Sequence, residues 1–290
     1  MTAYLKFISC ILPLFLACKP KRTPPAPQTA VNHSTTITID TVQTSKNTIF
    51  SRFTVPEGFE RTPRDTNSFA FFLSNLPLKK PQARVTYFDG TTKPNANVYV
   101  AVVDLPIGKR DLHQCADAVM RLRADYLFEQ GLYDSIHFNF TNGFKAEYSK
   151  WRKGKRIVVD GNRVYWKQRT APSDDPDDFW RYLEMVFSYA GTASLSKEMK
   201  PVPYASLQIG DVFIKGGFPG HAVIVVDMAT HVKTGKKAFL LAQSYMPAQE
   251  IQVLLNPDSE GGSGAWYFEN EKAPLQTPEW VFKTKALKRF

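Results

Sequence analysis

The stretch LQIGDVFIKGGFPGHAVIVVDM, residues 207–228, decides how the rest of the chain is interpreted. Two short apolar runs rich in β-branched residues are separated by the turn-forming sequence GGFPG, which is typical of two strands joined by a tight turn. His221 begins the second run, directly after Gly220. Because an imidazole in a buried strand needs a polar partner, His221 is the first candidate for a functional side chain.

Around this hairpin the sequence predicts one α+β domain over residues 49–290, with helices packed on a largely antiparallel sheet. Hydrophobic residues make up 43% of the 290 residues, which is enough for a sizeable core. Helical periodicity is found in residues 66–78, 110–131 and 173–191. Strand-like runs are found in residues 83–90, 97–106, 134–170, 236–248 and 250–256, and residues 277–290 predict a last strand followed by a basic tail.

The first 18 residues, MTAYLKFISCILPLFLAC, have the pattern of a signal peptide, because their apolar run is too short to span a bilayer. The ending Ala17-Cys18 resembles a bacterial lipobox, which predicts that Cys18 carries a lipid. An ordinary secretory signal with an incidental cysteine is the alternative. Lys19, in place of an aspartate, predicts the outer membrane. Residues 19–48, rich in Pro, Thr, Ser and Lys, predict a flexible tether from this anchor.

The formal net charge of +10 bears on the partners of the chain. A basic protein in the cell envelope suits anionic lipid and cell-wall carboxylates, and export makes nucleic acid a poor partner. Residues 145–169 hold nine Lys or Arg against two acids, interleaved with aromatic residues. This predicted hairpin has two interpretations: a surface that grips a polyanion or glycan, or a solvated face whose aromatic residues turn inward.

Cys115 is the one cysteine expected in the mature domain, because Cys10 lies in the signal core and Cys18 would carry the lipid. The pattern around it predicts a helix with Asp111 as N-cap, Gln114 completing a capping box, and Gly131 just beyond the helix end. Cys115 then falls in the first turn, where unpaired backbone N–H groups favour a thiolate. The alternative is a small core residue on an apolar helix face.

Thiol catalysis needs a base and a group that orients the base. His221 is the predicted base, and Gln243, on the adjacent predicted strand, is the leading candidate for the orienting group. Asp227 is the alternative, although about six residues of extended strand separate it from His221. His113 is an alternative base, although on the helix it would point away from the thiol.

Four residues are expected to line the cleft beside these groups. They are Tyr245, Gln249, Asp227 and His113. Because the sequence has no HExxH motif and no cysteine cluster, no metal site is expected. It also has no P-loop and no GxSxG motif, and no cofactor is expected.

The segments IGDVFI…GHAVIVVD and QCADAVMRL resemble the papain-like superfamily, in particular NlpC-type cell-wall endopeptidases and CHAP-type amidases. In those proteins a cysteine opens a helix packed on an antiparallel sheet, and the histidine begins a strand. QCADAVMRL lacks their usual serine–glycine pair after the cysteine. Over residues 49–290 the chain is also similar to an uncharacterised bacterial lipoprotein family, through RDLHQCADAVMRLRADYL, GDVFIKGGFPGHAVIVVDM, FLLAQSYMPAQ and TPEW.

Two functions from different classes follow. The first is a thiol hydrolase in the cell envelope acting on amide or peptide bonds of peptidoglycan, in which Cys115 attacks the carbonyl and backbone N–H groups stabilise the oxyanion. Acyl transfer on the same residues is a variant of it. The second is a non-catalytic lipoprotein that binds a cell-wall or surface polymer through the basic hairpin.

Overall fold

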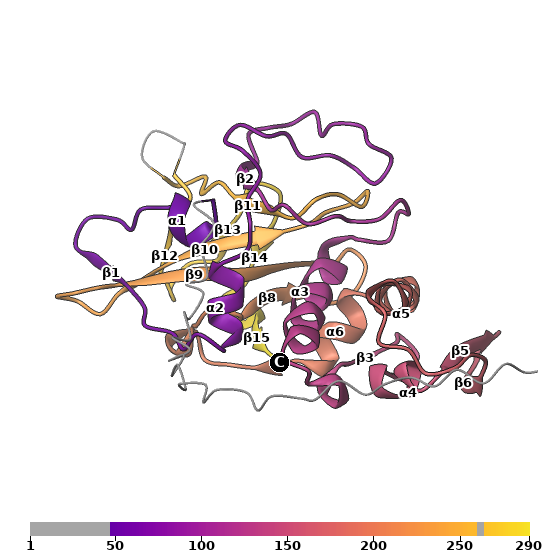
Figure 1. The fold of residues 1–290 in the computed structure, drawn as a ribbon. Helices are drawn as coiled ribbons and strands as arrows, with labels where there is room; N and C mark the ends of the chain where they lie inside the picture. The colour runs from indigo at the N-terminus through magenta and orange to yellow at the C-terminus, as the bar shows by residue number, and fades with distance from the viewer. Residues whose placement is uncertain (1–46, 260–263) are drawn as a thin grey trace, which may run out of the picture. The chain divides into compact units, whose positions relative to one another are not determined.

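The structure is a computed structural model that describes residues 47–259 and 264–290 (Figure 1). The expected signal peptide with Cys18, and nearly all of the expected tether, lie outside the described residues. The helices are α1 (Ile49–Arg52), α2 (Phe69–Ser74), α3 (Cys115–Glu129), α4 (Tyr148–Arg152), α5 (Pro176–Tyr189) and α6 (Thr192–Glu198). The strands are β1 (Phe59–Arg61), β2 (Tyr99–Val102), β3 (His137–Asn139), β4 (Lys145–Glu147), β5 (Lys155–Asp160), β6 (Arg163–Gln168), β7 (Lys200–Pro201), β8 (Val212–Lys215), β9 (His221–His231), β10 (Lys237–Gln243), β11 (Gln252–Leu254), β12 (Tyr267–Phe268), β13 (Leu275–Gln276), β14 (Val281–Phe282) and β15 (Leu287–Arg289).

One large antiparallel sheet organises these elements. Its strands follow one another in the order β2-β11-β10-β9-β8-β15-β7, while β1 pairs with the end of β9 and β12 pairs with β10. Every one of these pairings is antiparallel. The predicted α+β class with a largely antiparallel sheet is confirmed.

Strand β9 is the central strand, and its burial explains the apolar run that opens with His221. It is buried from His221 to Ala229, and helices α1, α2 and α3 pack against it. On the sheet, Phe213 of β8 packs against Phe239 of β10 and against Phe282 of β14, with ring centroids 6.1 and 6.3 Å apart. A strand enclosed in this way has no solvent face, so its sequence shows no polar alternation.

Helix α3 begins at Cys115, so that its N-cap lies three residues later than the predicted N-cap at Asp111. The observed N-cap is Gln114, whose backbone N–H donates to Asp117 Oδ2 at 3.0 Å. Asp111 instead accepts from Ala248 N at 2.6 Å and so ties the loop before the helix to the segment after β10. The predicted end is confirmed, because Gly131 follows the helix with a φ of 68°, a conformation that favours glycine.

Three other parts of the chain differ from the sequence predictions or were not covered by them. Residues 83–90 form no regular strand, because their backbone groups bind a turn and a neighbouring segment, as in Tyr87 N to Thr91 O (2.8 Å) and Phe88 N to Ala248 O (2.9 Å). Residues 148–152 and 192–198 form helices α4 and α6, which the sequence did not indicate. The expected basic tail contains β15, which lies between β8 and β7, and Arg289 binds the buried Asp211 at 2.6 Å.

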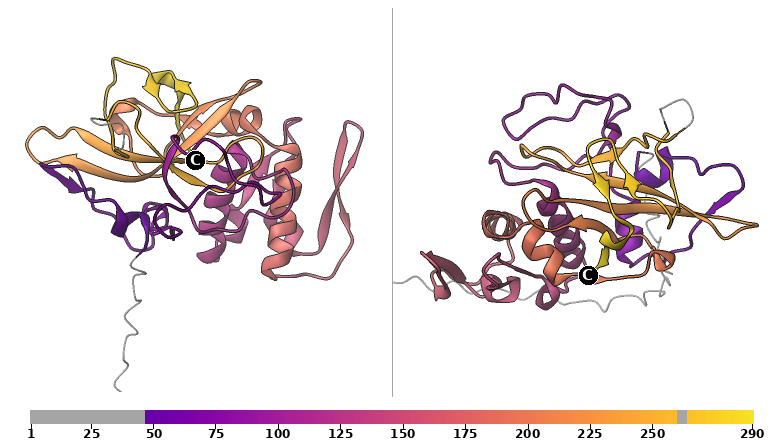
Figure 2. Two further views of the ribbon diagram at one scale, coloured as in Figure 1. Left: turned by 90° about the horizontal axis from the view of Figure 1, so that it is seen from above. Right: turned by 180° about the vertical axis from the view of Figure 1, so that it is seen from behind.

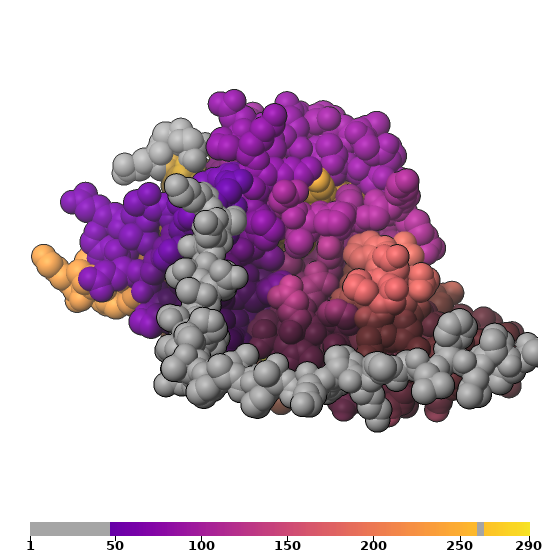
Figure 3. All heavy atoms as spheres, in the orientation of Figure 1, coloured from indigo at the N-terminus to yellow at the C-terminus, as the bar shows by residue number. Residues whose placement is uncertain are grey.

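The segment between α2 and α3 covers one face of the described chain. Figure 3 shows its atoms (purple and magenta) over most of the upper part of this face, so that little of the later strands (orange and yellow) is visible. Among residues 47–259 and 264–290, no helix is both long enough and apolar enough to cross a membrane.

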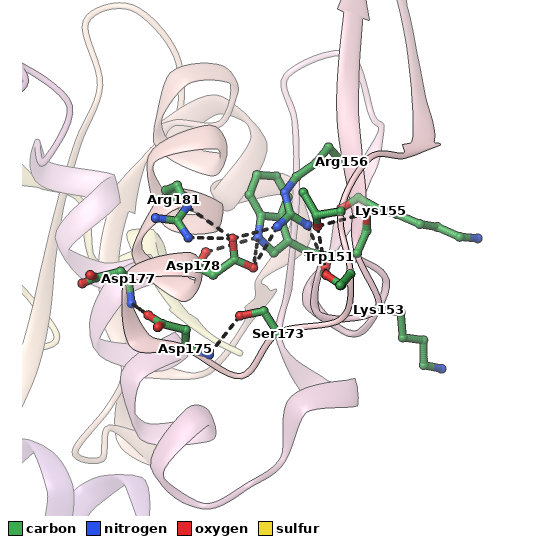
Figure 4. A network of polar contacts seen from close by, with 12 residues as sticks. Trp151, Lys153, Lys155, Arg156, Ser173, Asp175, Asp177, Asp178 and Arg181 are labelled. Atoms are coloured by element: carbon green, nitrogen blue, oxygen red, sulfur yellow. Dashed lines mark hydrogen bonds and ion pairs between the residues drawn. The ribbon is translucent and has the colours of Figure 1, made fainter. Parts of the chain in front are cut away.

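Hairpin β5–β6 projects away from the sheet and its helices (Figure 2). Its base is fixed by the buried Asp178 of α5, which accepts from Arg156 Nη2 at 2.7 Å and from Trp151 Nε1 at 3.1 Å (Figure 4). Arg181 reaches the same carboxylate at 3.2 Å, and the Arg156 guanidinium stacks on the Trp151 ring, 4.3 Å from its centroid. The base of the hairpin is therefore rigidly held by a charged network.

Candidate functional site

The start of helix α3 and the start of strand β9 meet at one cavity. This cavity has a volume of about 510 Å³, and Cys115, His221 and Tyr245 all line it. Cys115 is the first residue of α3, and His221 is the first residue of β9 after the glycine-rich turn. The two candidate catalytic side chains, 106 residues apart in the sequence, therefore share one cavity.

Gln243 fixes the imidazole of His221 by a hydrogen bond to one of its two ring nitrogens. The Oε1 of Gln243 lies 2.7 Å from His221 Nε2, and the Nε2 of Gln243 donates to Glu279 Oε2, also at 2.7 Å. Because a carboxylate can only accept, the amide must direct its NH2 at Glu279 and its oxygen at the ring. His221 Nε2 therefore carries the proton, and Nδ1 keeps a free lone pair that can accept a proton from a thiol.

Glu279 and Lys93 extend this chain of contacts, and neither was predicted from the sequence. Lys93 Nζ lies 3.0 Å from both carboxylate oxygens of Glu279, and the lysine is only 4% exposed. Glu279 belongs to the TPEW segment, which marked the family resemblance without suggesting a role for its acid. Lys93 lies between predicted strands, and no local pattern distinguishes it from a surface lysine.

Aromatic rings enclose the imidazole. The ring centroid of His221 lies 4.8 Å from that of Tyr245, 5.3 Å from that of Trp280 and 5.9 Å from that of Phe282. This packing leaves His221 1% exposed. The ring orientation is thus determined both by packing and by the hydrogen bond to Gln243.

Burial determines the charges of Cys115 and His221 in the absence of substrate. Burial, and to a smaller extent Asp117, raise the pKa of Cys115 to about 11, although the backbone N–H groups of Ala116 and Ala222 oppose this. Burial lowers the pKa of His221 to about 4, against the effect of the hydrogen bond to Gln243. At neutral pH the ligand-free site therefore holds a neutral thiol and a neutral imidazole.

These charges predict the chemical reactivity of Cys115. We expect iodoacetamide to alkylate Cys115 more slowly near neutral pH than a free thiol with a pKa of about 8.5, because only the thiolate reacts. The rate should keep rising until the pH approaches about 11. Mass spectrometry of the Cys115 peptide over a pH series gives this profile, and the same chain unfolded in guanidinium is the control. An alkylation rate that reaches its plateau below neutral pH would contradict a neutral Cys115 thiol beside a neutral His221 imidazole.

Three of the residues expected in the cleft are buried and do not line the cavity. Asp227 is 0% exposed and pairs with Arg61 (2.8 Å), and burial raises its pKa. Gln249 is 1% exposed, and its carbonyl oxygen accepts from Ser244 Oγ at 2.7 Å. His113 is 0% exposed, lies 3.3 Å from that same carbonyl oxygen through Nδ1, and has a pKa lowered by burial to about 3. The structure therefore brings together Cys115, His221, Gln243 and Tyr245, but not these three.

The basic hairpin has fewer free charges than its composition suggests. Four of its cations have acidic partners: Lys150, Arg152, Arg156 and Arg163. Its aromatic residues also pack against the protein: Tyr148 and Trp151 are buried, and the Trp166 ring lies 5.7 Å from that of Phe144. Both findings favour the interpretation of a solvated hairpin with inward-facing aromatic residues.

Within the described ranges, no group of three or more His, Cys, Asp or Glu side chains could hold a metal ion. The fold and site together define an α+β protein with an enclosed cysteine–histidine–glutamine arrangement.

Residues 49–289 match a protein family described as Domain of unknown function (4846), DUF4846, and the chain belongs to this family. No curated protein and no solved structure matches the chain. The expected membership of an uncharacterised family is confirmed. The relation to papain-like hydrolases stays a prediction.

Proposed function

We propose that this chain is a cysteine-dependent hydrolase of amide bonds, with a papain-like site of the NlpC type. The observation that carries the proposal is the hydrogen bond from His221 Nε2 to Gln243 Oε1, 2.7 Å long. It leaves Nδ1 as the ring nitrogen available to a thiol, in a cavity that Cys115 also lines. A nucleophile, a base and an orienting group in this order are the parts that thiol catalysis requires.

The proposed reaction proceeds through a thioester. As Cys115 Sγ attacks the substrate carbonyl carbon, its proton moves to His221 Nδ1, so the base removes the barrier that the high thiol pKa would otherwise impose. The imidazolium then gives this proton to the leaving amine as the C–N bond breaks. Water, deprotonated by the neutral imidazole, attacks the thioester, and Sγ leaves with the proton. The products are a carboxylic acid and an amine.

Backbone N–H groups at the start of α3 are suited to stabilise the oxyanion. The first hydrogen bond of the helix runs from Ala118 N to Gln114 O at 2.9 Å. The N–H groups of Cys115 and Ala116 precede it, and the positive end of the helix dipole lies at the same place. Negative charge that develops on a carbonyl oxygen beside Sγ would therefore meet oriented donors.

The rim of the cavity supports an extended substrate. Phe218 is 99% exposed and Met246 is 62% exposed, and both line the cavity. Large apolar side chains exposed at the edge of a polar site are typical of a surface that a ligand covers. We place the substrate bond in a peptide of the cell wall, and the protein in the cell envelope on a lipid attached to Cys18.

Acylation by a simple activated ester tests the chemistry separately from the substrate. We expect the purified chain to release p-nitrophenol from p-nitrophenyl acetate in a burst equal to the amount of protein, followed by slower turnover. Intact-mass spectrometry should show one acetyl group on the Cys115 peptide. Purified peptidoglycan should then yield new free amino groups, detected by dinitrophenyl labelling.

The matched control is Cys115→Ala, whose side chain is smaller by one sulfur in an apolar helix position. It should fold, as judged by an unchanged circular dichroism spectrum, and should show neither the burst nor the adduct. A wild-type protein that forms no adduct would exclude the hydrolase. Sedimentation of that same protein with peptidoglycan would then favour the alternative, a non-catalytic polymer-binding lipoprotein.

A further inference from the structure

Side chains of acidic types line the cavity, although the whole protein is basic. The formal net charge is +10, yet no lysine or arginine of residues 47–259 and 264–290 lines the cavity beside Cys115. Its charged lining consists of two acids, Asp111 and Asp117. A lining that contains acids but no lysine or arginine favours a cationic ligand group.

The two acids differ in how well the protein satisfies them. Asp111 Oδ1 accepts from Ala248 N at 2.6 Å and from Gln114 Nε2 at 3.0 Å, and its side chain is exposed. Asp117 is only 6% exposed; its Oδ2 accepts from Gln114 N, and its buried Oδ1 has no hydrogen-bond partner. Asp117 is therefore the acid with unused capacity to bind.

Capping of helix α3 does not explain this unused oxygen. One carboxylate oxygen is enough to hold the Gln114 amide, and an asparagine would do so without burying a charge. The environment also lacks a protein cation, since burial raises the pKa of Asp117 well above its usual range and no basic side chain lowers it. A buried polar atom without a partner carries a free-energy cost that a bound donor removes.

We propose that the substrate group bound beside Cys115 carries a primary ammonium, which donates to Asp117 Oδ1. The inference rests on the proposed hydrolase and narrows its substrate class to amine-bearing acyl compounds, such as peptides with a free amino group near the scissile carbonyl. An ammonium fits better than a neutral donor, because it supplies both a hydrogen bond and the missing positive charge. A metal ion fits poorly, since the described residues offer no group of three ligands.

Matched esters test this inference. The probes are the p-nitrophenyl esters of alanine and β-alanine, which carry an ammonium, and p-nitrophenyl propionate, which does not. Each acylation rate of the purified chain is divided by the rate of the same ester with N-acetylcysteine, which removes differences in intrinsic reactivity. We expect at least one ammonium ester to be preferred about tenfold or more over propionate.

Two isosteric variants show which of the two acids causes the preference for ammonium esters. Asp117→Asn keeps an oxygen for the Gln114 amide but removes the charge, and it should reduce the preference to near one. Asp111→Asn is the matched control on the same cavity wall and should keep the preference. The melting temperature of each variant shows that it is folded.

Each outcome bears on a different claim. Equal normalised rates for all three esters in the wild-type protein would overturn the ammonium inference and leave the hydrolase intact. A preference that survives in Asp117→Asn would overturn the assignment to Asp117. Absence of acylation by every ester would overturn the hydrolase, and the ammonium inference with it.

Discussion

Replacement of His221 by alanine is expected to lower the acylation rate of Cys115 near neutral pH by about a thousandfold. The reason is that the thiol pKa is about 11, so without a base almost no thiolate is present. The rate in His221→Ala should therefore rise about tenfold per pH unit toward that value, while the wild-type rate should change far less. The measurement is the p-nitrophenol burst rate over a pH series.

The same strand offers a matched control for this prediction. His231, at the other end of β9, packs edge-to-face with Phe59 at a ring-centroid distance of 5.0 Å and does not line the cavity. His231→Ala should acylate at the wild-type rate. A His221→Ala protein that acylates as fast as His231→Ala would show that His221 is not the base.

Substitutions of Gln243 and Glu279 should lower the acylation rate of Cys115 less than the substitution of His221 does. Gln243→Leu removes the group that fixes the proton on Nε2. Glu279→Gln changes the partner of Gln243 and also removes the charge that pairs with Lys93. We therefore expect the loss to decrease in the order His221, Gln243, Glu279, because each residue acts through the one before it. A loss in Glu279→Gln larger than in Gln243→Leu would contradict this positioning role.

Replacement of Arg61 by leucine is expected to destabilise the protein by about 3 kcal/mol, because it leaves the buried Asp227 with a poorer partner. Arg61 Nη1 lies 2.8 Å from Asp227 Oδ2 as an ion pair without hydrogen-bond alignment, and Arg64 lies farther away, at 3.5 Å. Urea unfolding of both proteins gives the difference in the free energy of unfolding.

The pH dependence of this difference has a defined sign. Burial raises the pKa of Asp227 in the folded protein, and loss of Arg61 raises it further. A carboxyl group with a raised folded pKa is destabilising at neutral pH and ceases to be so as the pH falls below its ordinary value. The difference between Arg61→Leu and wild type should therefore shrink toward pH 4, about the ordinary pKa of the group. The double variant Arg61→Leu with Asp227→Asn should recover most of the lost stability, and a loss unchanged by the second substitution would contradict the ion-pair explanation.

The central sheet and helix α3 could be predicted because their signals are local. The run HAVIVVDM and the glycine at the end of α3 each reflect a preference of the backbone itself. Residues 83–90 have the same β-branched composition as a strand, but their partners lie in a neighbouring segment, and nothing in their own sequence records this. The alternation of polar and apolar residues cannot distinguish these two cases.

The residues of the candidate site also differ in whether a local sequence pattern could predict them. Cys115, His221 and Gln243 could be proposed because a helix start, a strand start and an adjacent strand have recognisable patterns. Glu279 and Lys93 could not, because their contact joins positions 186 residues apart. Asp227 was expected in the cleft because it lies on the same predicted strand as His221, and only the structure shows that it pairs with Arg61.

The projecting hairpin β5–β6 has a practical consequence for experiments on this protein. Its tip, Gly161 and Asn162, is exposed, and it belongs to none of the residues that line the cavity. The charged network at its base holds the two strands independently of what the tip carries. A fluorophore or an affinity peptide inserted between these two residues would report on the protein in cells while leaving the cysteine cavity intact.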